Sequence, residues 1–137
     1  MRSFSSKAHR FLASLIGLTV FVQMFLAGLW HSGSVATPEA HVFTGLGLLL
    51  ASLLALIFSL VARNDGKVTR ATALLFILIL LQPILIETRR NGLPFISSFH
   101  ALNAGVIGMV SGVVVKMAGT APVVADDMAP VPAVSGD

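Results

Sequence analysis

The sequence contains no cysteine, and only 11% of its 137 residues are charged. The absence of cysteine excludes disulfides, thiolate metal sites, iron–sulfur clusters, cysteine nucleophiles and covalently attached haem. A soluble domain carries about 25% charged residues, so an ordinary water-soluble globule is excluded as well. No Ser-His-Asp set, phosphate-binding loop or pair of buried carboxylates stands out. We therefore do not expect a hydrolytic enzyme.

Hydrophobic residues dominate the chain instead, at 55% of the total with a mean hydropathy of +0.91. A chain this short cannot bury so much apolar surface inside itself, because small folds have a high surface-to-volume ratio. We expect the lipid bilayer to be its solvent. The formal net charge is +3, and we interpret the nine basic residues as markers of membrane topology and not as a sign of a nucleic-acid partner.

Four charge-poor runs have, or approach, the roughly 20 residues that cross the hydrocarbon layer. They cover residues 11–30, 42–62, 71–86 and 95–115. Backbone groups in lipid must be satisfied within the segment, which makes these runs helices. Short connections between them predict antiparallel neighbours. The fold predicted over residues 11–118 is an all-α, up-down transmembrane four-helix bundle, and no internal repeat is strong enough to use.

The basic residues lie mostly on one side of these spans. Only Arg89 and Arg90 fall on the other side, so the positive-inside rule places both termini in the cytoplasm of a bacterial plasma membrane. Residues 1–10 are expected to be a basic cytoplasmic N-terminus that includes a solvated His9, and 119–137 a disordered cytoplasmic tail. The seven residues on the predicted cytoplasmic side are Arg2, Lys7, Arg10, Arg63, Lys67, Arg70 and Lys116.

A cleaved signal peptide is the alternative for the N-terminus, because Ser34-Val35-Ala36 resembles a cleavage site. A signal core has about 7–15 apolar residues, and the first run is longer. We therefore favour a membrane span that ends at Trp30, a residue type suited to the interface.

Polar residues inside a membrane are costly and indicate function. Here they gather in the predicted outer half, where Gln23, His41, Gln82, His100 and Asn103 are found. The inner halves of the spans hold almost nothing beyond Ser and Thr. This one-sided distribution predicts a site near the outer face.

The spacing around the two histidines indicates what the site binds. If the second helix starts near Pro38 and the fourth near Pro94, His41 and His100 lie about 5 and 9 Å down their helices, at 1.5 Å per residue. Those helices are diagonal in an up-down bundle, so two imidazoles at similar depth can bind one iron from opposite sides. Small residues follow each histidine at steps of four, and this smooth stripe would admit a flat group: Gly45 after His41, then Ala104, Gly108 and Gly112 after His100.

The main hypothesis is thus a b-type haem protein for electron transfer or redox sensing, with His41 and His100 as the metal ligands. Arg89 and Arg90 can pair with the propionates, and Gln23, Gln82 and Asn103 can orient the ligands. A quinone or another membrane redox subunit would be the partner.

Simpler interpretations stay open for each feature. Gly/Ala stripes also serve helix packing, and glutamines also bond across helices. The whole chain can be a non-catalytic accessory or assembly subunit of a larger membrane complex. A divalent metal site at the outer face is a third hypothesis; its candidate ligands are His31, Glu39, His41, Glu87 and His100.

Two short stretches, 23–28 (Gln-Met-Phe-Leu-Ala-Gly) and 99–104 (Phe-His-Ala-Leu-Asn-Ala), together with His41, Gly45 and Gln82, resemble a family of small bacterial four-helix membrane proteins of unknown function. The resemblance covers about residues 11–118. That family is similar to four-helix b-type membrane cytochromes, in which histidines on facing helices bind haem. The resemblance implies the same ligands, His41 and His100. The chain differs from two-haem cytochromes because it has no histidine in the inner halves of its spans.

Overall fold

The computed structural model describes residues 2–120 and places four helices there, with no strand. They are α1 (Arg2–His31), α2 (Glu39–Val61), α3 (Gly66–Arg90) and α4 (Pro94–Thr120). Each is long and apolar enough to cross a membrane, which confirms the predicted all-α bundle of membrane-spanning length. The predicted tail falls almost entirely outside the described residues, and its first two residues belong to α4.

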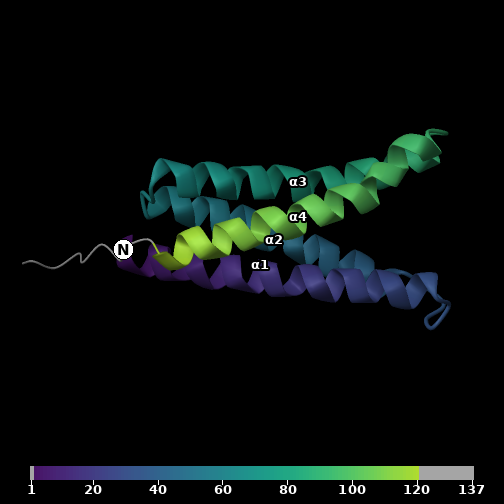
Figure 1. Ribbon diagram of the computed structural model, residues 1–137, viewed down its shortest axis with the longest axis horizontal. Helices are drawn as coiled ribbons and strands as arrows, with labels where there is room; N and C mark the ends of the chain where they lie inside the picture. The colour runs from purple at the N-terminus through teal and green to yellow at the C-terminus, as the bar shows by residue number, and fades with distance from the viewer. Residues whose placement is uncertain (1, 121–137) are drawn as a thin grey trace, which may run out of the picture.

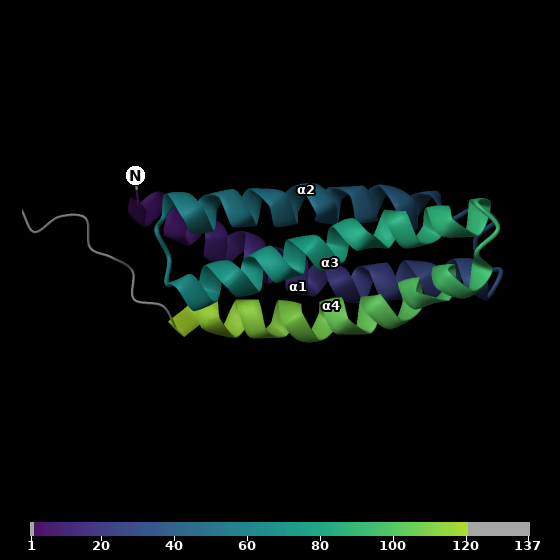
Figure 2. The same ribbon diagram turned by 90° about the horizontal axis from the view of Figure 1, so that it is seen from above.

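The helices run up and down along one long axis (Figure 1; Figure 2). Helix α1 packs on α2 and α4, and α3 packs on the same two helices. Within residues 2–120, no Cα atoms of α2 and α4 come within 8 Å of each other. These two helices are therefore diagonal across the bundle, as predicted.

The start of α1, the α2–α3 loop and the end of α4 share one end of the bundle (Figure 2). We call this the basic end, because it carries the seven basic residues named above. The α1–α2 and α3–α4 loops share the other end, which we call the histidine end. His41 and His100 lie within the first two turns of α2 and α4, the helices that start there.

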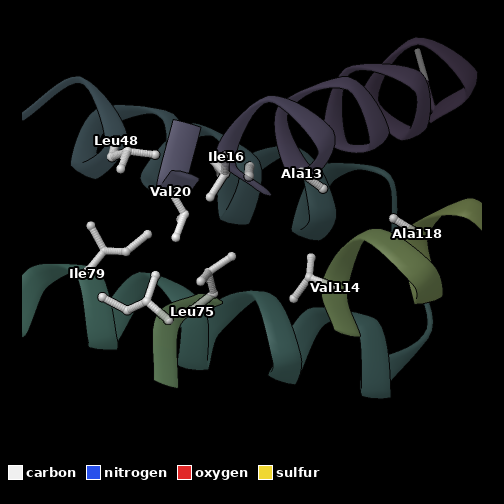
Figure 3. Packing of buried hydrophobic residues seen from close by; sticks show 10 residues of the cluster. Ala13, Ile16, Val20, Leu48, Leu75, Ile79, Val114 and Ala118 are labelled. Atoms are coloured by element: carbon white, nitrogen blue, oxygen red, sulfur yellow. The ribbon is translucent and has the colours of Figure 1, made fainter. Parts of the chain in front are cut away.

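The core between the two ends is a narrow column of small and aliphatic side chains (Figure 3). Most other large apolar side chains face outward, as expected of helices long and apolar enough to cross a membrane. The column fixes the helix faces that carry the polar groups at either end. Its members are Ala13, Ile16, Val20, Leu48, Ala55, Leu75, Ile79, Ile107, Val114 and Ala118.

The two helical hairpins repeat each other with an offset of 59 residues. Gly33 and Gly92, in the two loops at the histidine end, have φ angles of 74° and 77°. Buried positions follow the same offset, in the pairs Ala13/Thr72, Ile16/Leu75, Val20/Ile79, Leu48/Ile107, Ser52/Ser111, Ala55/Val114 and Ser59/Ala118. The chain is thus a tandem of two equivalent hairpins around a pseudo-twofold axis along the bundle, a repeat that the sequence analysis did not find.

The prediction for His9 was wrong. Its side chain is only 1% exposed, because α1 begins at Arg2 and carries His9 onto the core face of the helix. Its ring bonds to Thr72 on α3 and to Asn64 in the α2–α3 loop. The basic end is therefore closed by a polar cluster and not by a solvated flank.

Candidate functional site at the histidine end

His41 and His100 face each other across the bundle. Their ring centroids are 6.2 Å apart and the ring planes are inclined by 66°. The two residues come from the diagonal helices α2 and α4, and both are half-buried. The structure therefore brings together the two histidines that the sequence analysis selected as ligands.

Each imidazole is held by a backbone carbonyl of a neighbouring helix. Nδ1 of His41 lies 3.2 Å from the carbonyl oxygen of Gln23, and Nδ1 of His100 lies 3.3 Å from that of Gln82. A carbonyl only accepts, so each Nδ1 donates its proton. A neutral imidazole protonated at Nδ1 keeps a lone pair on Nε2, and neither Nε2 has a hydrogen-bond partner among residues 2–120. Both rings therefore present the nitrogen that binds metals.

The two contacts are equivalent positions of the repeat. Each histidine lies 18 residues after the glutamine that orients it. Gln82 follows Gln23, and His100 follows His41, by the same 59 residues that relate the core positions. The site thus consists of two half-sites, one from each hairpin.

The glutamine side chains lie beside the imidazoles and are incompletely paired. Nε2 of Gln23 donates to the carbonyl of His41 at 3.0 Å. The amide oxygens Oε1 of Gln23 and Gln82 are both buried and have no hydrogen-bond donor. An unpaired buried acceptor is unfavourable by about 1–3 kcal/mol, and here it occurs at both equivalent positions.

The small-residue stripe packs against α1 for part of its length. A Cβ on Gly45 would lie 2.9 Å from Nε2 of Gln23, and one on Gly108 would lie 3.8 Å from Cγ1 of Val20. Ala104 is half-buried, whereas Gly112 is exposed and has nothing within 4 Å of a built Cβ. At Gly45 and Gly108 the stripe therefore receives side chains of α1.

Asn103 lies one turn beyond His100 and is 8% exposed. Its Nδ2 donates to the carbonyl of Leu78 on α3 at 2.8 Å. A hollow of about 420 Å³ adjoins it between α3 and α4, and neither His41 nor His100 lines it. Its lining is apolar apart from the asparagine: Leu81, Leu85, Ile96, Phe99, Leu102, Asn103 and Val106.

The other candidate residues do not converge on the histidine pair. Arg90 pairs with Glu87 at 3.1 Å on the exposed end of α3, and Arg89 is exposed beside it. His31 lies beside Trp30, with ring centroids 5.0 Å apart and ring planes inclined by 42°. Residues 2–120 contain no group of three His, Cys, Asp or Glu side chains able to hold a metal ion. The divalent-metal hypothesis therefore has no three-ligand cluster to support it in this part of the chain.

Sequence reasoning missed the carbonyls of Gln23 and Gln82 as the groups that orient the histidines. The signal was present in the equal 18-residue spacing of the two Gln–His pairs. It was hard to recognise because few residues are identical between the hairpins.

No protein-family model, curated protein or solved structure matches the chain. Fold and site together define a class of protein: a four-helix bundle of membrane-spanning length with two facing histidines at one end. The family resemblance described above stays a prediction from the residues quoted for it.

Proposed function

We propose that the chain is a membrane b-type haem protein that transfers electrons or senses redox state, with His41 and His100 as the two iron ligands. The observation that carries this proposal is the facing pair of imidazoles, each with its Nδ1 bonded to a carbonyl and its Nε2 free. Proteins commonly orient a metal-binding histidine by a hydrogen bond that its other ring N–H donates to a backbone carbonyl.

The separation of the rings supports the proposal. A metal–imidazole bond is about 2.0–2.1 Å long, so two rings opposite each other on one metal have centres roughly 6 Å apart. The observed value is 6.2 Å. His41 and His100 would therefore hold the haem if it were bound.

The donor set fits haem iron better than a divalent ion bound by protein alone. Two neutral nitrogens supply only two ligands, while a porphyrin supplies the rest. If His41 and His100 both held the haem iron, the group would supply one-electron transfer and leave no open position for a substrate. The protein's own part is to fix the two rings and exclude water.

The proposed location follows from charge. With the basic end in the cytoplasm of a bacterial plasma membrane, the histidine pair lies in the outer half of the bilayer. The proposed partner is a lipid-dissolved quinone or another membrane redox subunit, because the exposed helix faces are largely apolar and suit a partner within the bilayer.

An optical spectrum tests the proposal. The protein is expressed with haem supplied, purified in detergent and measured as a reduced-minus-oxidised difference. We expect a b-type band, with one haem per chain, and its loss in His41→Ala and in His100→Ala. His31→Ala is the matched control, because His31 lies outside the pair, and it should keep the band.

Absence of the band with haem supplied, or its full retention in His100→Ala, would overturn the proposal. Stable co-purification with larger membrane subunits in the absence of any cofactor would instead favour the accessory-subunit hypothesis.

A further inference from the structure

We infer that the two histidines are held by different sets of hydrogen bonds between helices, which we call clamps. The difference between Gly45 and its counterpart Ala104 determines which clamp each half-site uses. The effect on a bound cofactor rests on the proposed function; the clamps themselves do not. The first half-site is Gln23, His41 and Gly45, and the second is Gln82, His100 and Ala104, each 59 residues later.

The first half-site uses a reciprocal pair of hydrogen bonds between two residues. Nδ1 of His41 donates to the carbonyl of Gln23, and Nε2 of Gln23 donates back to the carbonyl of His41 at 3.0 Å. Gly45, one turn after His41, leaves the space for that amide. A Cβ at this position would lie 2.9 Å from Nε2 of Gln23, so the amide would have to move away from the position in which it makes the second bond.

The second half-site has only the first of these two bonds. Ala104 carries the Cβ that Gly45 lacks, and no hydrogen bond joins the side-chain amide of Gln82 to any residue in 2–120. His100 keeps its bond to the Gln82 carbonyl at 3.3 Å. The methyl group of Ala104 therefore accounts for the missing reciprocal bond.

In the second half-site, a hydrogen bond donated by Asn103 takes the place of the missing reciprocal bond. Pro83 has no N–H, so the carbonyl of Ile79 loses its helical donor next to Gln82. Nδ2 of Asn103 ties this turn of α3 to α4 through the neighbouring carbonyl of Leu78, at 2.8 Å. In the first hairpin, the counterpart of Asn103 is Thr44, whose hydroxyl donates to Ala40 of its own helix.

The consequence is an asymmetric pair of imidazoles on a nearly symmetric scaffold. Both the ring and the backbone of His41 are tied to the same residue of α1. The ring of His100 is tied to α3, whereas its backbone is not. His100 is therefore the more adjustable of the two ligands, and Gln23 and Asn103 are positioning residues.

The chain has only two glutamines, which makes the first clamp directly observable. Protein labelled with ¹⁵N in the glutamine side chains, without cofactor and in detergent micelles, gives two side-chain amide groups by NMR, assigned with Gln82→Met. We expect one Gln23 proton to exchange with water about tenfold more slowly than those of Gln82, the factor for one hydrogen bond. Gly45→Ala should remove this protection, and Ala104→Gly should confer it on Gln82.

Gly47→Ala is the matched control, because a Cβ there has nothing within 4 Å, and it should leave both amides unchanged. Protection of Gln23 that survives Gly45→Ala, or equal protection of the two glutamines in the unaltered protein, would overturn the inference.

A second measurement links the clamp to the cofactor. In haem-loaded protein, Gly45→Ala should shift the midpoint potential and the low-temperature EPR signal, whereas Gly47→Ala should shift neither. An unmoved potential and EPR signal in Gly45→Ala would refute the link to the cofactor. Failure of haem binding with normal amide protection would refute the proposed function and leave the clamps in place.

Discussion

His9 and Thr72 are joined across the basic end by a hydrogen bond of 3.0 Å between Nε2 of the ring and the hydroxyl oxygen. The one hydroxyl proton of Thr72 goes to the carbonyl of Val68 at 2.9 Å, so Nε2 of His9 must donate. Nδ2 of Asn64, which can only donate, lies 3.3 Å from Nδ1, so Nδ1 accepts. This network holds His9 as the neutral Nε2–H form and leaves it no nitrogen for a metal.

Thr72→Val should therefore destabilise the protein. The change leaves the N–H of His9 buried without an acceptor, at a cost of about 1–3 kcal/mol. Unfolding of the purified protein in detergent micelles measures the loss. Lys7→Ala, at an exposed position of the same helix, is the control, and an equal stability of the two variants would contradict the assigned network.

The sequence was sufficient to predict the four helices and to predict that the second and the fourth lie diagonally across the bundle. The length and hydropathy of each run predict a membrane-spanning helix. The short loops predict that helices consecutive in the sequence pack side by side and antiparallel. The depth of His41 and His100 then followed from helix rise, since α2 and α4 begin within one residue of the expected starts.

The burial of His9 could not be read in the same way. Lys7 and Arg10 flank it, and a charged flank in sequence looks solvated unless the helix is known to extend to Arg2. Side-chain contacts such as the one between Gln23 and His41 also could not be predicted from the sequence, because they depend on the rotation of each helix about its axis. The repeat was not recognised in the sequence, because different apolar residues can occupy equivalent lipid-facing and core positions with little effect on stability.

The orientation in the membrane is testable with single cysteines, since the chain has none of its own. Asn91→Cys places a thiol in the α3–α4 loop, and Thr120→Cys places one at the end of α4; both positions are exposed. If the basic end is cytoplasmic, a membrane-impermeant maleimide should label Asn91→Cys in intact cells. Thr120→Cys should react only after permeabilisation, and the opposite pattern would reverse the proposed topology.

Gly108 tests whether the small-residue stripe serves packing. A Cβ there makes ordinary van der Waals contact with Val20 at 3.8 Å, and alanine favours a helix over glycine by about 1 kcal/mol. Gly108→Ala should therefore leave unfolding in detergent unchanged or raise its midpoint. Gly108→Phe should lower the midpoint, because the ring would force α1 and α4 apart. A large loss for Gly108→Ala would contradict this packing.

Asn103→Leu should weaken the α3–α4 contact. The bond to Leu78 is lost, and polar bonds between helices in a membrane contribute about 0.6 kcal/mol on average and up to about 1.7. Unfolding in micelles measures the difference. Ser98→Ala is the control, because its hydroxyl bonds only to Phe95 of its own helix. A loss no greater than that of the control would mean that Asn103 is not a clamp.

Gln23→Met and Gln82→Met, measured without cofactor, should differ in their effect on the free energy of unfolding. Both changes remove a buried amide oxygen that has no donor, which by itself favours methionine. Only Gln23→Met also breaks a bond, the one from Nε2 to the carbonyl of His41.

Gln82→Met should thus be neutral or stabilising by up to about 1 kcal/mol, because an unpaired acceptor is removed and nothing is broken. Gln23→Met should be destabilising relative to it by about 0.6–1.7 kcal/mol, the range for an interhelical bond in a membrane. The two positions are equivalent in the repeat, and both variants lose an unpaired Oε1. The difference between their stabilities therefore measures the bond from Nε2 of Gln23 to the carbonyl of His41. Unfolding of both variants in the same micelles gives this difference directly, and identical stabilities would mean that the Gln23 amide does not clamp His41.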